Sequence, residues 1–315
     1  MEQSKNPIHI TILSGGVGPE REVSLSSGNA LAEALKHHYS VDLVDLKESK
    51  VPEGLDPRQT VVFPVIHGTF GEDGSLQSML DEQGFIYAGS DCEGSRLCMD
   101  KVRAKKVVQA EGVRVAKHIF FNEPKGLDLR EIHQELGPDL ILKPTDQGSS
   151  VALYVLKGID DLQDTLSTLS RGNWMLEQRV FGREFTVGVL RDMALGIVEV
   201  IPQGGVYDYK RKYTPGFTDY KYPAILPLSI EEEVKRQAVD CFRACGCRDF
   251  ARIDFIVCED GNPHFLEVNT LPGLTSTSLL PKSASCSGYN FSALVKELLR
   301  PAISRFTRLN LLPAA

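Results

Sequence analysis

The sequence predicts an α/β part at the N-terminal end and α+β parts after it. Strand and helix signals alternate as far as about residue 97, which is typical of a parallel, doubly wound sheet. A small α+β unit follows, and a third part with long successive strand signals begins near Arg183. A chain of 315 residues with 42% hydrophobic content has room for two or three such domains.

The first part has three apolar strand signals, at residues 9–13, 41–46 and 61–66. A tight turn at Gly15-Gly16 follows the first strand, and residues 24–35 then show helical apolar spacing. In a doubly wound sheet, ligands bind in the crevice at the carboxyl ends of the strands. His67 directly follows the third strand and is therefore expected to face this crevice, although a lone histidine is more often structural.

The second part opens with a helix that carries Lys101 and runs to Gly112. Strand signals follow around Ile119 and Leu140 and at 151–155 and 174–176. Between two of these strands, Lys143 precedes a small turn at Gly148-Ser-Ser150, whose backbone N–H groups could cradle phosphate oxygens. The turn lacks the residue order of a Walker A loop, and a surface turn beside an ordinary strand lysine is the alternative interpretation.

The third part begins with strand signals at 184–190 and 195–201, which predict an antiparallel pair. The long segment 202–227 mixes aromatic and cationic residues, as expected of a lid over charged phosphates. Ser229 and Glu232 have the spacing of a capping box and predict the start of a helix. A C-terminal helix is expected at 291–306.

Near the end of the chain, two apolar runs carry Asp254 on one side and Glu267 and Asn269 on the other. Alternation along a strand puts Glu267 and Asn269 on one face, and a hairpin would bring Asp254 to the same face. Three oxygen ligands on one wall suit Mg²⁺, which takes its remaining ligands from waters and substrate phosphates. The alternative interpretation is the solvated polar face of a hairpin.

Glu20 opens the first predicted helix, within Glu20-Arg-Glu-Val-Ser24. An acid at this position is a favourable partner for the helix dipole, and it is also suited to hold the ammonium group of an amino acid. The sequence alone leaves both interpretations open.

Charge and composition exclude several classes of protein. The net charge of -7 argues against nucleic-acid binding. No apolar run approaches the roughly 20 residues needed to span a bilayer, and the first residues lack the pattern of a signal peptide. The seven cysteines show no zinc-binding spacing and are interpreted as idle or buried thiols of a reducing compartment.

Taken in order, the motifs of this chain resemble those of the D-alanine–D-alanine ligases of the ATP-grasp superfamily. Those that carry the resemblance are Gly15-Gly16, Glu20 to Ser24, His67-Gly68, Gly71 to Gly74, Met99 to Lys101, Lys143-Pro144, Gly148 to Ser150, Glu184 to Thr186, Lys212-Tyr213, Arg252 to Asp254, Glu267 to Asn269 and Pro272-Gly273. The resemblance implies a Rossmann-like domain over 1–97, followed by a two-subdomain ATP-grasp fold over 98–182 and 183–315. It places ATP between the last two.

The resemblance also implies roles for single residues. The residues matched to ATP contacts are Lys101, Lys143, Ser150, Glu177, Val180, Glu184 and Lys212. Asp254, Glu267 and Asn269 match the ligands of two Mg²⁺ ions, for which Mn²⁺ substitutes. The residues matched to D-alanine binding and catalysis are Glu20, His67, Ser149, Tyr213, Arg252, Gly273, Ser278 and Leu279, with the last two beside the second D-alanine.

The implied activity is ATP-dependent synthesis of D-alanyl-D-alanine for peptidoglycan through an acyl phosphate, by a cytoplasmic homodimer. A D-alanine–D-lactate or D-alanine–D-serine ligase and a non-catalytic nucleotide-binding protein remain alternatives, although Lys212-Tyr213 favours dipeptide formation. The chain departs from the family pattern at Ala152, where glycine is usual, and at Arg179 and Val206 near the expected nucleotide site.

Overall fold

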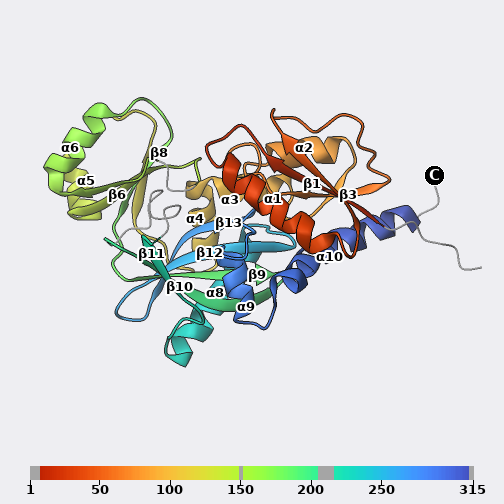
Figure 1. Ribbon diagram of the computed structural model, residues 1–315. Helices are drawn as coiled ribbons and strands as arrows, with labels where there is room; N and C mark the ends of the chain where they lie inside the picture. Colours follow the sequence, from red (N-terminus) through yellow and green to blue (C-terminus); the bar gives the residue numbers. More distant parts are fainter. Residues whose placement is uncertain (1–7, 149–151, 205–215, 312–315) are drawn as a thin grey trace, which may run out of the picture.

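The computed structural model describes residues 8–148, 152–204 and 216–311, in which the strands form three sheets (Figure 1). Ser149, Ser150, Val206, Lys212 and Tyr213 lie outside the described residues. None of the helices in these ranges combines the length and the apolar character that a membrane crossing requires.

The first sheet is parallel and confirms the predicted N-terminal α/β part. Its order is β2 (Ser40–Leu46), β1 (His9–Gly15), β3 (Thr60–Pro64) and β4 (Ile86–Tyr87). Alternation along β1 sends Ile10 and Ile12 into a core beneath α1 (Arg21–Leu35), whereas Leu13 joins the opposite core with α2 (Ser75–Glu82). Helices on both faces therefore bury the central strands β1 and β3, as a parallel sheet requires, while the edge strand β2 is largely exposed.

The C-terminal helix α10 (Phe291–Leu311) returns to this first sheet, where it packs beside α1 (Figure 1). Leu294, Leu298 and Phe306 share a core with Ile10 and Phe63. Arg305 of α10 adds a polar anchor, because its guanidinium donates to both carboxylate oxygens of the buried Asp249 at 2.6 and 2.7 Å. Apolar packing thus joins α10 to the first sheet, and the ion pair joins α10 to the residue that directly precedes β12.

We expect Arg305→Ala to lower the free energy of unfolding by about 2–3 kcal/mol, because the substitution leaves the buried Asp249 carboxylate without its cation. Urea unfolding followed by circular dichroism measures the change. Arg300→Ala, on the same helix, removes an exposed guanidinium from Glu297, which keeps Arg191 as a second partner, and should change stability by less than about 1 kcal/mol. Equal effects of the two substitutions would contradict the anchoring role of Arg305.

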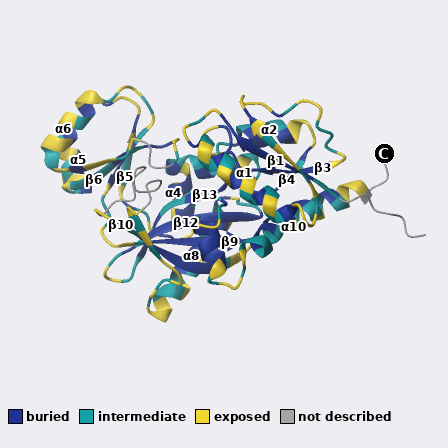
Figure 2. Cartoon of the chain, in the orientation of Figure 1, coloured by how far each residue is buried: buried dark blue, intermediate teal, exposed yellow. Residues whose placement is uncertain are grey.

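The second sheet is antiparallel, in the order β5 (His118–Phe121), β8 (Trp174–Gln178), β6 (Asp139–Pro144) and β7 (Tyr154–Lys157). Helices α5 (Leu129–Leu136) and α6 (Gly158–Thr168) bury leucines and an isoleucine against it, and their outer faces are exposed (Figure 2). Helices α3 (Cys92–Met99) and α4 (Lys101–Ala110) connect it to the first sheet.

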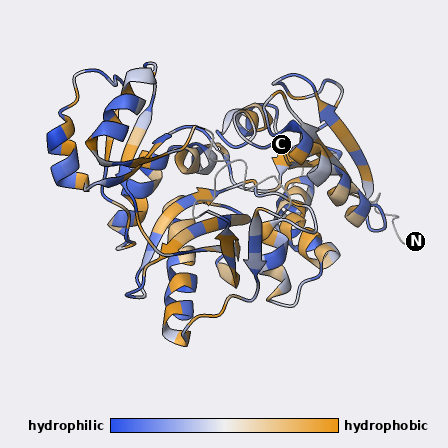
Figure 3. Cartoon of the chain, turned by 60° about the vertical axis from the view of Figure 1, so that its left-hand side comes forward, coloured by the Kyte–Doolittle hydropathy of each residue, from blue (hydrophilic) through white to orange (hydrophobic). Residues whose placement is uncertain are grey.

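The third sheet is antiparallel, in the order β11 (Thr218–Lys221), β10 (Met193–Pro202), β9 (Arg183–Leu190), β12 (Phe250–Val257) and β13 (Pro263–Asn269). Its apolar face packs against α8 (Leu228–Ala244), and its strands carry many of the hydrophobic residues seen in Figure 3. Gly188 and Leu190 on the other face meet α9 (Leu279–Ser285). This second face carries the polar residues described below.

Two predictions for this part are wrong. Helix α8 begins at Leu228 with Pro227 as its N-cap and has no side-chain cap, so Ser229 is already inside the helix and the capping box does not form. The segment 202–227 is not a loop throughout, because strand β11 within it pairs with β10. In a strand of only four residues at the edge of a sheet, the sequence pattern is too short to predict the strand. Pairing with β10 decides that this segment is extended.

The thiols are more closely grouped than the sequence indicated. Cys98 Sγ lies 3.5 Å from Cys247 Sγ, although the two cysteines are far apart in the chain. Hydrogen bonds with Cys245 and Cys247, together with burial, raise the pKa of the Cys98 thiol well above its usual value. A protonated buried thiol is unreactive, which agrees with the interpretation of these cysteines as free structural thiols.

Candidate active site

The hairpin formed by β12 and β13 brings the predicted acidic residues together. Asp254 pairs with Glu267, and Arg252 pairs with Asn269, in an antiparallel register. Directly opposed residues share a face, so all four side chains lie on the side of the sheet away from α8. The predicted common face is confirmed, and Arg252 is added to it.

Asp254 is held by its neighbours on this face. The Arg252 guanidinium donates to its two carboxylate oxygens at 3.0 and 2.8 Å, and the Thr186 hydroxyl donates to Oδ1. Beside this pair, the amide oxygen Oδ1 of Asn269 is buried and has no hydrogen-bond partner among the described residues. An unsatisfied buried acceptor beside Glu267 and opposite Arg252 is suited to a cation or a donor group of a ligand.

A metal at this place would use few protein ligands. The described residues contain no group of three or more histidine, cysteine or acidic side chains spaced to hold a metal ion. Asp254 and Glu267 supply two carboxylates, and Asn269 supplies the unpartnered amide oxygen. This set fits Mg²⁺, which keeps waters and phosphate oxygens in the rest of its shell, better than it fits metals that need a full protein cage.

One pocket of about 350 Å³ lies between the second and third sheets. Of the residues matched to ATP or metal contacts, it is lined by Lys101, Lys143, Glu177, Val180, Glu184, Asp254 and Glu267. The wall is otherwise largely apolar, with Ile141, Phe265 and Leu266 among its residues. Apolar walls with a few charged groups at one end are suited to a nucleotide base and its phosphates.

Glu177 organises the cations of this pocket. Its carboxylate lies 2.5 Å from Lys143 Nζ and 2.9 Å from Lys105 Nζ, and the latter contact is an ion pair without hydrogen-bond alignment. Burial lowers the pKa of Lys105, which is fully enclosed. Burial raises the pKa of Glu177, but the charges of Lys105 and Lys143 outweigh it and lower that pKa to about 2.

This low pKa has a consequence for stability. Since the folded value lies below the usual glutamate value of about 4.3, the stabilisation from Glu177 is complete above that pH and is lost as the pH falls toward 2. We expect Glu177→Gln to lower the unfolding free energy by about 2–3 kcal/mol at pH 7 and by less at pH 3. Urea unfolding at both pH values measures this, with the exposed Glu135→Gln as the control. A pH-independent difference would count against this role.

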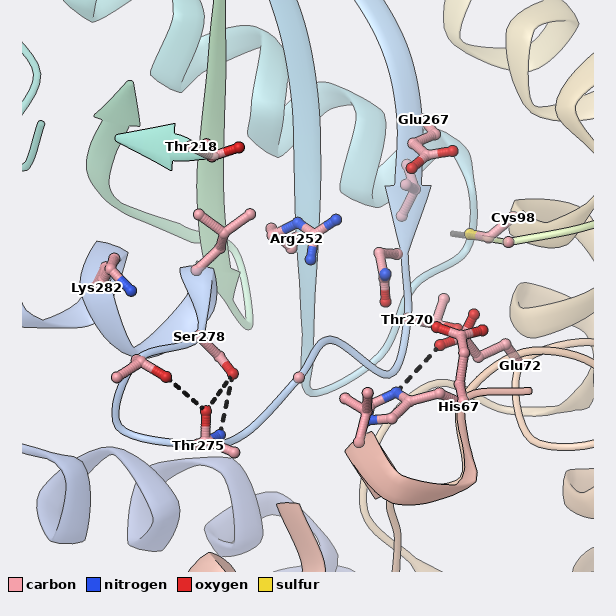
Figure 4. A pocket seen from close by; sticks show the side chains of 18 of the residues that line it. His67, Glu72, Cys98, Thr218, Arg252, Glu267, Thr270, Thr275, Ser278 and Lys282 are labelled. Atoms are coloured by element: carbon pink, nitrogen blue, oxygen red, sulfur yellow. Dashed lines mark hydrogen bonds and ion pairs between the residues drawn. The ribbon is translucent and has the colours of Figure 1, made fainter. Parts of the chain in front are cut away.

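A second pocket, of about 640 Å³, lies between the first and third sheets. The predicted site residues in its wall are Glu20, His67, Lys101, Arg252, Glu267, Asn269, Gly273, Ser278 and Leu279. Figure 4 shows Arg252 near the middle of this pocket, with His67 and Glu72 on one side and Ser278 and Lys282 on the other. The pocket therefore has an acidic end and a basic, hydroxyl-rich end.

His67 and Glu72 form the acidic end together with Glu20. His67 Nδ1 lies 2.9 Å from the Leu271 carbonyl and 3.5 Å from Glu72 Oε1, so it joins the first sheet to the loop after β13. Burial opposes protonation of His67, but Glu72 outweighs burial and raises the pKa of the histidine. Burial in turn raises the pKa of Glu72. The prediction that His67 faces the crevice is confirmed.

The loop between β13 and α9 is shaped by close contacts. A Cβ atom on Gly273 would lie 3.0 Å from Ser278 Oγ, so a side chain there would crowd the hydroxyl. Ser278 Oγ accepts from the Thr275 backbone N–H at 3.1 Å and lies 2.8 Å from Thr275 Oγ1 (Figure 4). The backbone of Gly273 therefore remains accessible beside a fixed hydroxyl group.

The two pockets share Lys101 and Glu267. Lys101 Nζ donates to the Gln147 carbonyl at 2.6 Å and lies 3.9 Å from Glu267 Oε2. A phosphate entering from one pocket and a carboxylate entering from the other would meet beside this ammonium group. This is the geometry that a phosphoryl transfer between two ligands requires.

Every predicted site residue within the described ranges lines one of these two pockets. Sequence reasoning missed Lys105, Thr186, Glu72, Thr275 and Lys282 as parts of the site. Glu72 lies in the motif Gly71 to Gly74 and could have been found there. Lys105 and Thr186 had no sequence signal, because an interior lysine on a helix and a threonine in a strand are unremarkable until their partners are known.

Two departures from the family pattern can be placed. Ala152 has φ of 51°, in the left-handed region that glycine adopts without strain, which explains why glycine is usual there. Arg179 lies with its guanidinium 4.8 Å from the ring centroid of Phe181, in the wall of the pocket between the second and third sheets. The cation is therefore directed onto an aromatic face.

Comparisons with known proteins agree with this geometry. The sequence profile described as the D-ala D-ala ligase C-terminus matches residues 107–300. A D-alanine–D-alanine ligase from Geotalea uraniireducens is 36% identical over 302 residues, which cover 95% of this chain and 97% of the relative.

Two solved structures are similar over nearly the whole chain. A D-alanine–D-alanine ligase from Bacillus anthracis complexed with ATP has a TM-score of 0.81 and 28% identity, covering 96% of this chain and 99% of that one. The D-Ala:D-Ser ligase VanG from Enterococcus faecalis has a TM-score of 0.83 and 27% identity, covering 94% and 99%. The expected Rossmann-like and ATP-grasp architecture is confirmed, and the chain belongs to the D-alanine–D-alanine ligase family.

Proposed function

We propose that this protein uses ATP to phosphorylate the carboxylate of one D-alanine and then joins that residue to a second D-alanine, for peptidoglycan synthesis. The observation that carries the proposal is the sharing of Lys101 and Glu267 by the two pockets. A carboxylate is a poor electrophile in water, and conversion to an acyl phosphate supplies the leaving group that amide formation needs. The chemistry therefore requires a nucleotide and an amino acid to meet at one point.

In the nucleotide pocket, we propose that Val180 and the apolar wall hold the base, Glu184 meets the ribose, and Lys101 and Lys143 contact the phosphates. Glu177 positions Lys143 through their 2.5 Å ion pair. Ser150 and Lys212 are further proposed contacts that lie outside the described residues. These cations offset the charge that develops on the transferred phosphoryl group.

Asp254, Glu267 and Asn269 are proposed to hold Mg²⁺. When bound, the metal offsets negative charge on the β- and γ-phosphates of ATP. The Arg252 and Thr186 contacts keep the Asp254 carboxylate in a fixed orientation. Its two oxygens have about four lone-pair sites, so one remains for the metal.

In the other pocket, Glu20 is proposed to hold the ammonium of the first D-alanine, with Ser149 and Tyr213 as partners outside the described residues. The Arg252 guanidinium and the Gly273 backbone are proposed to stabilise the negative oxygen of the tetrahedral intermediate. His67 and Glu72 line this end of the pocket beside Glu20. Leu279 and Ser278 are proposed to border the second D-alanine.

Phosphate release from ATP over a panel of D- and L-amino acids tests the activity. D-alanine should give phosphate and D-alanyl-D-alanine in equal amounts, with the dipeptide identified by mass spectrometry, whereas L-alanine should give neither. An absence of phosphate release with any amino acid would favour a non-catalytic nucleotide-binding protein instead.

A D-alanine–D-serine ligase is the second candidate, because VanG is as similar in fold as the D-alanine–D-alanine ligase. Competition between D-alanine, D-serine and D-lactate as second substrate distinguishes these activities. If D-alanyl-D-serine or D-alanyl-D-lactate is the main product, the first candidate is replaced. We further propose a cytoplasmic homodimer, which size-exclusion chromatography with light scattering tests.

A further inference from the structure

Lys282 is a buried cation that is not among the residues matched to roles in the family. It lies in α9 and lines the pocket that contains Arg252, with only 9% of its surface exposed. No acidic side chain among the described residues forms an ion pair with it. An enclosed ammonium group without a carboxylate partner is costly, so an anion that enters the pocket is favoured beside it.

Two aromatic rings surround this ammonium group. Its Nζ lies 4.7 Å from the ring centroid of Tyr220 and 5.8 Å from that of Tyr222. Cation–π contacts favour the charged form, while burial lowers the pKa of the lysine. The rings also displace water from the lysine, and an anion that reaches it is bound in a medium where charge attraction is strong.

The charges of the pocket follow an order. Glu72 lies at the acidic end, where the charge of Glu20 also acts on His67 and Glu72. Arg252 lies near the middle, and Lys282 lies at the far end with the hydroxyl groups of Thr275 and Ser278 (Figure 4). A dipeptide carries its charges in the same order, with an ammonium at one end, the reacting carbonyl in the middle and a carboxylate at the other end.

We propose that Lys282 is the counter-ion for the carboxylate of the second amino acid and thereby selects substrates with an α-carboxylate at that position. The proposal rests on the proposed ligase function and adds a specificity-determining residue to it. Ser278 and Thr275 complete the anion contact with hydroxyl groups, whereas Lys282 supplies its charge. Selection by charge predicts that a neutral analogue is a poor second substrate even though its amine is intact.

Lys282→Met tests the proposal, because methionine keeps most of the apolar volume between the tyrosine rings and removes the charge. The second substrate is either D-alanine or D-alaninamide, which lacks the carboxylate charge. We expect the variant to raise the KM for the second D-alanine about tenfold to a hundredfold and to leave reaction with D-alaninamide nearly unchanged. The preference for D-alanine over D-alaninamide should shrink by the same factor, and Lys282→Arg should restore part of it.

Hydroxylamine trapping provides a readout that does not use the second substrate. If Lys282 acts on the second amino acid, formation of the D-alanine hydroxamate from the acyl phosphate should be the same in wild type and in Lys282→Met. Lys296→Met, on α10 outside both pockets, is the matched control.

An unchanged preference between D-alanine and D-alaninamide would overturn the proposal. An equal loss of hydroxamate and dipeptide would also overturn it, since the lysine would then serve the fold or the first step. A wild-type protein that forms neither hydroxamate nor phosphate would instead refute the proposed ligase function, so the two failures are distinguishable.

Discussion

Glu267→Gln is expected to lower kcat by about a hundredfold to a thousandfold, because it removes one of two carboxylates from the face that meets the phosphates of ATP. Glutamine keeps the shape of the side chain, and its loss of charge weakens Mg²⁺ binding. Phosphate release at increasing Mg²⁺ concentrations measures both effects, and the half-saturating Mg²⁺ concentration should rise.

Glu259→Gln is a suitable control, because it lies exposed at the turn of the same hairpin and should retain full activity. Asp254 is a less clear test, since its removal also leaves Arg252 without its carboxylate partner. If Glu267→Gln shows wild-type turnover with unchanged Mg²⁺ dependence, the metal assignment is wrong.

Arg252→Lys is expected to lower kcat about a hundredfold while the KM for ATP stays nearly constant. The planar guanidinium uses Nε and Nη2 to hold Asp254 and still extends into the substrate pocket. A lysine ammonium is a compact point charge and cannot hold the carboxylate in this bidentate way while reaching the reacting carbonyl. Steady-state kinetics with ATP and D-alanine measure the two constants separately.

The same substitution at Arg243, which is exposed and pairs with Asp192 on the surface, should leave both constants unchanged. Retention of wild-type kcat in Arg252→Lys would show that positive charge alone is sufficient at this position. A large rise in the KM for ATP instead would place Arg252 in nucleotide binding.

The hairpin site is the part that sequence reasoning predicted best. Alternation within a strand is a local property, so the shared face of Glu267 and Asn269 follows from their spacing. The opposing position of Asp254 also followed, because the short turn between the two runs restricts their register. The joint order of the motifs then led to the family, which single motifs could not have done.

Other features depend on contacts between distant segments. The Asp249–Arg305 ion pair, the Glu177 pair with two lysines and the contact of His67 with the Leu271 carbonyl each join elements from different parts of the chain. Charged residues of these types are common on helices and strands, so no local sequence pattern marks these residues as partners. Ser229 is the opposite case, because the local pattern of a capping box is present but the cap does not form. The helix begins one residue earlier, at Leu228, so Ser229 already lies inside it.

The sequence by itself determined the three-part α/β and α+β order, the polar face of the β12–β13 hairpin and the family, since periodicity and motif order are properties of neighbouring residues. Tertiary structure decided that Lys101 and Glu267 stand where two pockets join, and that Lys282 is buried beneath two tyrosines. The physical reason is that a pocket is formed by side chains from separate elements, and their distances are set by how the sheets pack.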